Sequence, residues 1–268
     1  MNLSLDQPIY PNQQALLPFA LTDVLIESVS QNKQPLLHFW QLENTMILGM
    51  KDTRVANLKQ GVAHLQTAGY PPVIRSAGGL GVISDPDVLN ISLFIPQGSH
   101  TTSSAYEEMY RLTQMAFPEL AIVTGEVFDS YCPGTYDLSC NGKKIAGIAQ
   151  RKIKAGIAIM MYLSVSGAQQ NRGQIVRDFY LTSLKEHFGQ DGYPPVNPAS
   201  MTTVSDVMAE KIPIAQTKER FLTAFSKLKK SNISQMDSSD WLMATENRTL
   251  YEEKLNRMIT RNQILETL

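Results

Sequence analysis

A long β-hairpin in the middle of the chain restricts the fold more than any other feature. Residues 144–154 and 157–165 are two extended segments joined by a turn at Ala155 and Gly156. Residues 89–95, with the sequence Leu-Asn-Ile-Ser-Leu-Phe-Ile, alternate in the manner of a half-buried strand. The middle of the chain is therefore predicted to form a β-sheet.

Further strands and a helix are expected before this hairpin. Residues 35–41 and 45–49 look like paired strands around a turn at Glu43 and Asn44. Residues 55–67 suit a short helix. The first part of the chain is therefore predicted to mix strands with helices.

A capping box predicts where another helix begins. Ser104 is followed three residues later by Glu107, so a helix is expected to open there and to end before Pro118. After about Arg172 the apolar residues recur mainly at helical spacing. Strands first and helices later predict an α+β domain of mixed sheets packed with helices. Residues 189–198, rich in glycine and proline, are the best position for a linker.

The composition excludes several classes of protein. Of the 268 residues, 43% are hydrophobic and 18% are charged, which permits an ordinary core. Lysine plus arginine number 24 and aspartate plus glutamate 25, and this balance argues against a general nucleic-acid binder. The N-terminus lacks the features of a signal peptide, and the longest uncharged apolar stretch, residues 155–165, is too short to span a bilayer. We expect a cytoplasmic protein with no nucleic-acid or membrane partner.

Sequence motifs for metals and common cofactors are absent. The four histidines are scattered, and no cysteine–histidine spacing suits zinc. The sequence has no P-loop motif and no Gly-x-Ser-x-Gly elbow. We therefore expect no metal and no cofactor.

A glycine-rich segment begins at Arg75, with the sequence Arg-Ser-Ala-Gly-Gly-Leu-Gly-Val. Its glycines let the backbone pass close to a bound group, and its amides can bind an anion or a carbonyl oxygen. Arg75 would supply a fixed positive charge. The alternative is a plain turn between two strands.

Cys132 lies in a turn-forming context, Ser-Tyr-Cys-Pro-Gly-Thr-Tyr-Asp. The Pro-Gly pair would lift the thiol out of regular structure toward a cleft, where nucleophiles commonly lie. The alternative is a small buried hydrophobic residue, the usual fate of a free cysteine. The second cysteine, Cys140, belongs to a strand-like segment and is interpreted as structural.

Lys144 follows Cys132 by twelve positions in the sequence Asn-Gly-Lys-Lys-Ile-Ala-Gly. A lysine at this place could stabilise a thiolate, move protons to and from an amine, or stabilise an oxyanion. Lys143 is the better candidate for a solvated lysine. Arg151, Lys152 and Lys154 add a local basic stretch that is either a solvated face or a docking site for an acidic partner.

Three segments of the sequence together resemble one known superfamily. They are residues 39–54, residues 75–93 and residues 137–151, the last with the run Gly-Lys-Lys-Ile-Ala-Gly. In this order they resemble the catalytic domain shared by lipoate-protein ligases, octanoyltransferases and biotin ligases. The resemblance implies a fold like that of class II aminoacyl-tRNA synthetases over residues 35–220, with residues 221–268 as a helical C-terminal segment packed on it.

Within that superfamily the segment around Cys132 most resembles the lipoyl amidotransferases, which are octanoyltransferases that draw on the glycine cleavage H protein. The resemblance implies that Cys132 carries the acyl group as a thioester and that Lys144 assists. It implies two protein partners: the octanoylated H protein as donor and the lipoyl domains of 2-oxoacid dehydrogenase E2 subunits as acceptors. The expected substrate-binding residues are Arg75, Gly78, Gly79, Asp85, Ala146 and Gly147.

Departures from the superfamily pattern bear on the alternatives. Lipoate ligases show a fuller Arg-Arg-x-Ser-Gly-Gly-Gly loop, whereas here one arginine is present and Leu80 interrupts the glycines. This departure weakens the interpretation of the chain as an ATP-dependent ligase. A ligase also needs no cysteine at position 132. Three alternatives stay open: transfer from octanoyl-acyl carrier protein, ATP-dependent ligation of lipoate, and a non-catalytic module that holds carrier domains.

Overall fold

The main sheet contains strands from both ends of the chain. The computed structural model describes residues 2–7, 9–243 and 245–268. Among them, eight strands form one mixed sheet in the order β11-β1-β2-β6-β10-β9-β8-β7. Their bounds are β1 (Asn2–Asp6), β2 (Leu36–Trp40), β6 (Val88–Pro96), β7 (Val123–Thr124), β8 (Leu138–Cys140), β9 (Lys143–Ile153), β10 (Gly156–Ser164) and β11 (Ile233–Asp237).

The predicted hairpin is confirmed as β9 and β10, which pair antiparallel from Ile153 and Gly156 onward. Its turn lies one residue earlier than expected, at Lys154 and Ala155, and Lys154 takes a φ of 52° there. Strand β10 also pairs antiparallel with β6 along its whole length. The hairpin is therefore the centre of the sheet.

A smaller sheet stands beside the main one. It has the order β4-β3-β5, with β4 (Pro72–Ile74), β3 (Thr45–Leu48) and β5 (Val82–Ser84). The predicted pairing of residues 35–41 with residues 45–49 is wrong, because β2 belongs to the main sheet and β3 to the small one. The segment around Leu42 carries the chain from one sheet to the other. Its backbone forms hydrogen bonds to Tyr10 on either side of Leu42.

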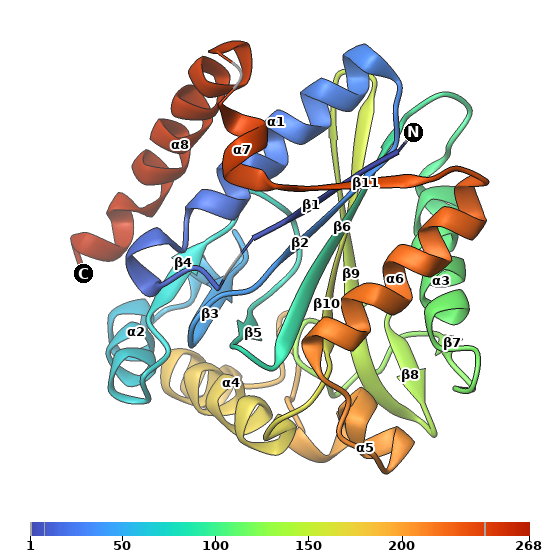
Figure 1. The fold of residues 1–268 in the computed structure, drawn as a ribbon. Coiled ribbons are helices and arrows are strands. Elements are labelled where there is room, and N and C mark those ends of the chain that lie inside the picture. The colour runs from blue at the N-terminus through green and yellow to red at the C-terminus, as the bar shows by residue number, and fades with distance from the viewer. Residues whose placement is uncertain (1, 8, 244) are drawn as a thin grey trace.

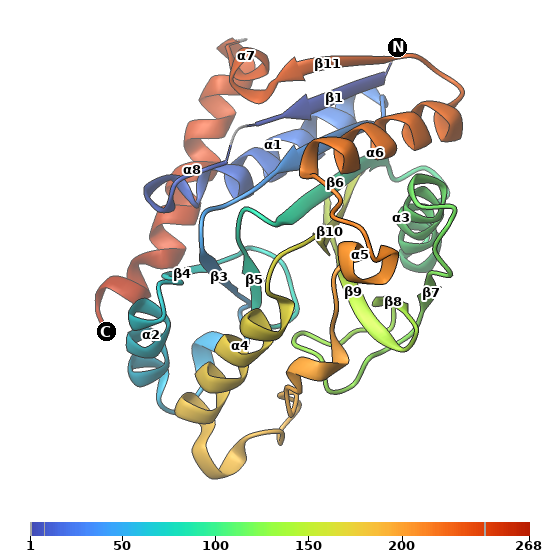
Figure 2. The same ribbon diagram turned by 60° about the horizontal axis from the view of Figure 1, so that its bottom comes forward.

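Helices cover both faces of the main sheet. Helix α1 (Leu17–Asn32) packs against β6, β9 and β10 on one face, while α3 (Thr102–Ala116) and α6 (Ile214–Lys229) pack together on the other (Figures 1 and 2). Helix α8 (Thr245–Glu266) lies along α1. The predicted α+β class is confirmed. The two short helices are α5 (Val204–Met208) and α7 (Ser238–Leu242).

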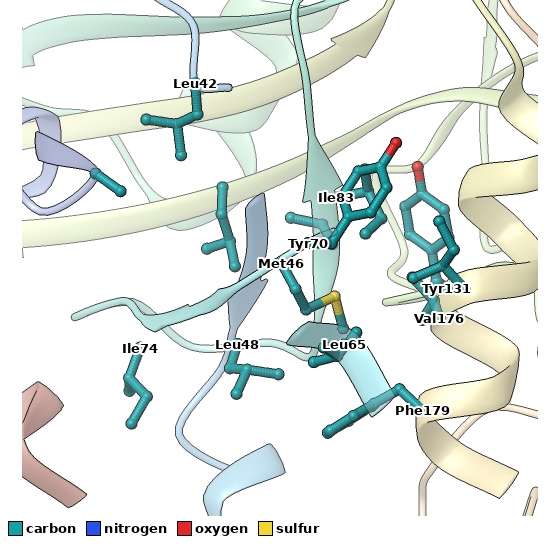
Figure 3. Close-up of a cluster of buried hydrophobic side chains, with 14 of the residues drawn as sticks. Leu42, Met46, Leu48, Leu65, Tyr70, Ile74, Ile83, Tyr131, Val176 and Phe179 are labelled. Atoms are coloured by element: carbon teal, nitrogen blue, oxygen red, sulfur yellow. The ribbon is translucent and has the colours of Figure 1, made fainter. Parts of the chain in front are cut away.

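An apolar cluster anchors the small sheet to two further helices. Helices α2 (Leu58–Thr67) and α4 (Gln169–Leu184) pack against each other beside it. Figure 3 shows Leu48 of β3 and Leu65 of α2 in this cluster, with Phe179 of α4 on its other side. All three side chains are buried. This packing fixes the small sheet, whose strand β4 leads into the glycine-rich segment.

Burial and capping differ in two places from the sequence prediction. Strand β6 is buried on both faces, not on one, because α1 covers one side and α3 with α6 the other. The capping box of α3 is formed by Thr101 and Ser104 instead of Ser104 and Glu107. The helix begins earlier because Thr101 Oγ1 accepts the Ser104 amide at 3.1 Å.

The ends of the chain add elements that the sequence pattern did not reveal. Residues 1–34 show no clear pattern in the sequence, yet β1 and α1 lie among them. Strand β11, in the segment after residue 220, pairs in parallel with β1 (Figure 1). The proposed division at residue 220 falls within α6. Among the described residues, no helix is long and apolar enough to cross a membrane.

His38 is an unusual member of the core. Its side chain in β2 is fully buried, and neither ring nitrogen has a hydrogen-bond partner among the described residues. Burial, with Lys218 as a smaller cause, lowers the pKa of His38 from 6.5 to about 3. The folded protein therefore holds this imidazole neutral where an unfolded chain would protonate it.

This burial predicts an acid-sensitive contribution to stability. Below pH 6.5 the unfolded chain binds a proton at His38, whereas the folded chain binds it only near pH 3. The free energy of unfolding therefore falls as the pH falls through this range. The loss reaches about 3 kcal/mol at pH 4. Urea unfolding of the wild type and His38→Leu between pH 7 and pH 4 measures it. Equal pH slopes for the two proteins would contradict the prediction.

Candidate active site

Cys132 lies on the loop between β7 and β8 in a conformation that side chains rarely adopt. Its φ is 48°, in the left-handed region, and the following residue is Pro133. Its Sγ accepts the backbone N–H of Leu80 at 3.1 Å, and Arg75 Nη2 lies 3.8 Å away. A thiol held out on a strained loop beside two donors is typical of a functional cysteine.

The glycine-rich segment forms the wall opposite Cys132. It connects β4 to β5, and Arg75 Nη2 folds back on it by donating to Gly78 O at 2.8 Å and Leu80 O at 3.0 Å. Gly79 has a φ of 92°. A Cβ atom added there would lie 2.6 Å from Arg75 Nη2 and 3.0 Å from Cys132 Sγ. A glycine is therefore required where this loop meets the thiol.

Lys144 holds the Cys132 loop from beneath. Its side chain is 1% exposed, and Nζ lies 2.8 Å from Asp137 Oδ1. Nζ also donates to three oxygens of the loop, Cys132 O at 2.9 Å, Tyr131 O at 3.0 Å and Ser130 Oγ at 3.2 Å. The ammonium group thus fixes the backbone that carries the thiol.

Asp137 completes this buried ion pair. Its Oδ2 accepts the amides of Gly134 at 3.2 Å and Val127 at 3.3 Å. Burial raises the pKa of Asp137, while Lys144 and these amides act in the opposite direction. The carboxylate ties both ends of the Cys132 loop to Lys144.

A cavity of about 310 Å³ opens beside Cys132. It is mostly apolar and reaches across the main sheet to the first turns of α1, with walls that include Phe19, Trp40, Ile47, Val82, Met160 and Tyr162. Its size is at the lower end of the range for ligand pockets. A short acyl chain attached to Sγ would fit a cavity of this size and polarity.

The predicted site residues do not all lie at this cavity. Those that line it are Cys132, Arg75, Gly78, Gly79 and Gly147. Lys144 lies below it and contacts the Cys132 loop. Ala146 points away, since it is fully buried in the apolar layer under α3.

Asp85 is engaged in a buried ion pair. Its carboxylate accepts from Arg172 Nε at 2.6 Å and from Arg172 Nη2 at 2.8 Å. Arg172 is 1% exposed and also donates to Ser166 O at 2.8 Å. Asp85 therefore ties α4 to the end of β5 and does not line the cavity.

The sequence reasoning missed several residues of the site. Asp137 stands in the same motif as Lys144, and the need to pair a buried lysine was the signal that would have found it. Phe19 and Thr22 line the cavity from α1, a helix for which the sequence provided no clear pattern. Tyr106 lines it from α3 and stacks on Tyr136 with ring centroids 4.8 Å apart.

Two residues of the basic stretch on the hairpin pair with acidic side chains of α1. Arg151 makes two bonds to the Asp23 carboxylate, at 2.6 and 2.9 Å, and donates to Ser76 O at 2.7 Å. Lys154 pairs with Glu27 at 2.6 Å. Only Lys152 of the three is left exposed without an ion pair among the described residues, so a docking role for the whole stretch is not supported.

Comparison with known proteins agrees with this geometry. The family model of the lipoyl protein ligase A/B catalytic domain matches residues 14–226. By backbone shape, a crystal structure of lipoate-protein ligase A bound with ATP superposes with a TM-score of 0.74 at 17% identity, covering 96% of this chain and 95% of that one. The fold is therefore that of the lipoyl protein ligase A/B catalytic domain.

Two proteins related in sequence are named as acyltransferases that act with GcvH. The octanoyl-[GcvH]:protein N-octanoyltransferase of an Exiguobacterium species is 36% identical over 94% of this chain and 88% of its own length. The lipoyl-[GcvH]:protein N-lipoyltransferase of Listeria monocytogenes is 35% identical over 95% of this chain and 91% of its own. The chain belongs to the lipoyl protein ligase A/B catalytic domain family, and the predicted resemblance is confirmed.

Two neighbouring glycines provide a test of the site geometry. We expect Gly79→Ala to destabilise the fold by about 1–3 kcal/mol through its positive φ, and to slow the reaction of Cys132 with iodoacetamide. Its Cβ would displace both Arg75 and the thiol. Gly78→Ala is the matched control, because a Cβ there meets no atom within 4 Å. Thermal unfolding and labelling rates check this, and equal effects of the two changes would contradict it.

Proposed function

We propose that this chain is an acyltransferase of protein lipoylation. It moves an octanoyl or lipoyl group from a lysine of the glycine cleavage H protein to a lysine of the lipoyl domains of 2-oxoacid dehydrogenase E2 subunits. The acyl group rests on Cys132 as a thioester between the two transfers. The relatives named octanoyl-[GcvH] and lipoyl-[GcvH] transferases support the H protein as donor.

The observation that carries the proposal is the position of Cys132 Sγ. It lies in the wall of an apolar cavity and accepts the Leu80 amide at 3.1 Å. A ligase that activates a free acid needs no nucleophile at this point. An enzyme that passes through a covalent acyl group needs one beside the acyl-binding cavity.

The first half of the reaction breaks the donor amide. The Cys132 sulfur attacks the carbonyl carbon, so a C–S bond forms and the C–N bond to the donor lysine breaks. The proton of the thiol ends on the departing amine, which must be protonated to leave. The backbone amide of Leu80 in the glycine loop lies beside Sγ, near the point where negative charge develops on the carbonyl oxygen.

The second half forms the product amide. The acceptor lysine, as a neutral amine, attacks the thioester carbonyl and releases Cys132, which takes up the proton lost by the amine. One amide is exchanged for another, so the overall reaction is near thermoneutral and needs no ATP. The thioester divides one difficult transfer into two easier steps.

The cavity supplies the binding energy for the acyl chain. Each methylene removed from water contributes roughly 0.8 kcal/mol. Gly147 lets the Tyr162 ring take its place in the cavity wall, since a Cβ at Gly147 would lie 2.6 Å from that ring. The cavity would thus hold an octanoyl chain while the carbonyl stays at Sγ.

Intact mass measurement tests the covalent step. We expect one octanoyl adduct after mixing the protein with octanoylated H protein without ATP and quenching in acid, and hydroxylamine should release it. Cys132→Ala should show no adduct. Cys140→Ala should keep it, because that thiol is 1% exposed and lies within β8.

The same experiment separates the alternatives. If the adduct forms only from octanoyl-acyl carrier protein, that protein and not the H protein is the donor. Transfer of free lipoate that depends on ATP and survives Cys132→Ala would overturn the thioester in favour of a ligase. No adduct and no transfer from any donor would leave a module that only holds carrier domains.

Lys144 is expected to support both the fold and the transfer. Lys144→Met would leave Asp137 buried without its counter-charge, which costs roughly 3–5 kcal/mol in the free energy of unfolding. It would also release the carbonyl of Cys132. Lys143→Met is the matched control, because that side chain is exposed. Urea unfolding and transfer rates measure both effects, and a Lys144 variant as stable and active as the control would refute this role.

A further inference from the structure

The Leu80 amide that points at Cys132 belongs to a glycine-rich loop that Arg75 holds through the carbonyls of Gly78 and Leu80. Three of the four residues from Gly78 to Gly81 are glycine, so the backbone there has many accessible conformations. The Leu80 amide must nevertheless stay 3.1 Å from Sγ to donate its hydrogen bond to the Cys132 sulfur. Groups outside the loop restrict the backbone on either side of Leu80 further.

Tyr180 of α4 restricts the loop on one side. Its hydroxyl accepts the backbone N–H of Gly81 at 3.2 Å. Gly81 directly follows Leu80, so the bonded amide is one residue from the amide that reaches the thiol. The Tyr180 side chain is fully buried in the core between the small sheet and α4.

Asp52 holds both Tyr180 and the backbone beneath the loop. Its Oδ1 accepts the Tyr180 hydroxyl at 2.8 Å, and its Oδ2 accepts the Gly49 amide at 2.7 Å. Gly49 is in contact with the loop, since a Cβ there would lie 1.9 Å from Gly79 O. One carboxylate therefore fixes the loop at Gly79 through Gly49 and at Gly81 through Tyr180.

This arrangement is costly in a core of apolar side chains. Asp52 is fully buried, and burial raises its pKa to about 6 in spite of Tyr180, the Gly49 amide, Arg75 and Lys51. If Asp52 and Tyr180 served packing alone, two apolar side chains of similar volume would stabilise the core as well or better. Both polar ends of the network terminate on backbone next to the residues that surround the thiol.

We propose that Tyr180 and Asp52 are positioning residues for the acyl transfer, which hold the glycine loop so that the Leu80 amide stays on Cys132 Sγ. Neither side chain lines the cavity beside Cys132. This inference rests on the proposed role of Cys132 as the nucleophile.

Two variants and two readouts test it. We expect Tyr180→Phe and Asp52→Asn to lower kcat for octanoyl transfer by about 10-fold to 100-fold, as for a small misplacement of a reacting group. KM should change less than about 3-fold, since the cavity walls are unchanged. Iodoacetamide should also label Cys132 more slowly in both variants. This second readout needs no acyl donor, so it stays informative if the proposed substrates are wrong.

Tyr110→Phe is the matched control. That tyrosine donates one bond of similar length, 3.0 Å to Ile122 O, at the C-terminal side of α3. It should keep wild-type kcat and labelling rate. Thermal unfolding shows whether each variant folds. If either Tyr180→Phe or Asp52→Asn does not fold, the other variant provides the test.

Two results would overturn the proposal. The first is a folded Tyr180→Phe or Asp52→Asn protein with kcat and labelling rate within about 2-fold of the wild type. The second is a fall in kcat with Cys132 labelled at the wild-type rate, which would mean that these residues act elsewhere. Slower labelling with a lower kcat and a steady KM is the outcome that supports it.

Discussion

The active site is built around Lys144, whose side chain is 1% exposed. Its ammonium group lies among oxygens of Asp137, Cys132, Tyr131 and Ser130. Burying a charge is expensive unless it is paired and fully hydrogen-bonded. The ion pair with Asp137 meets that condition only when the loop follows one path. That path places Cys132 at a positive φ with its sulfur turned to the glycine loop.

The site depends equally on the way two sheets meet. The main sheet contributes the floor of the cavity and two anchors, Lys144 in β9 and Asp137 directly before β8. The small sheet contributes Arg75 and the glycines between β4 and β5. The hydrogen bond from the Leu80 amide to Cys132 Sγ is one of the contacts between these two parts. The cavity therefore lies where the two sheets face each other.

Regions far from the chemistry in the sequence support this contact. Helix α1 closes the cavity with Phe19 and neutralises Arg151 through Asp23. Helix α8 reaches the small sheet, where the Asn262 side chain accepts from the Ile74 amide at 2.7 Å and donates to its carbonyl at 3.1 Å. Ile74 directly precedes Arg75, so both ends of the chain help to define the site.

The sequence by itself determined the local pieces: the β9–β10 hairpin, the α+β class, and the motifs that contain Cys132 and Lys144. These follow from periodicity, turn chemistry and short-range spacing, which act between near neighbours. Only the tertiary structure decided that β2 and β3 enter different sheets, that Asp85 pairs with Arg172, and that Gly147 faces the cavity while Ala146 faces away. Each of these depends on which distant segment packs against the residue, and no local pattern encodes that choice.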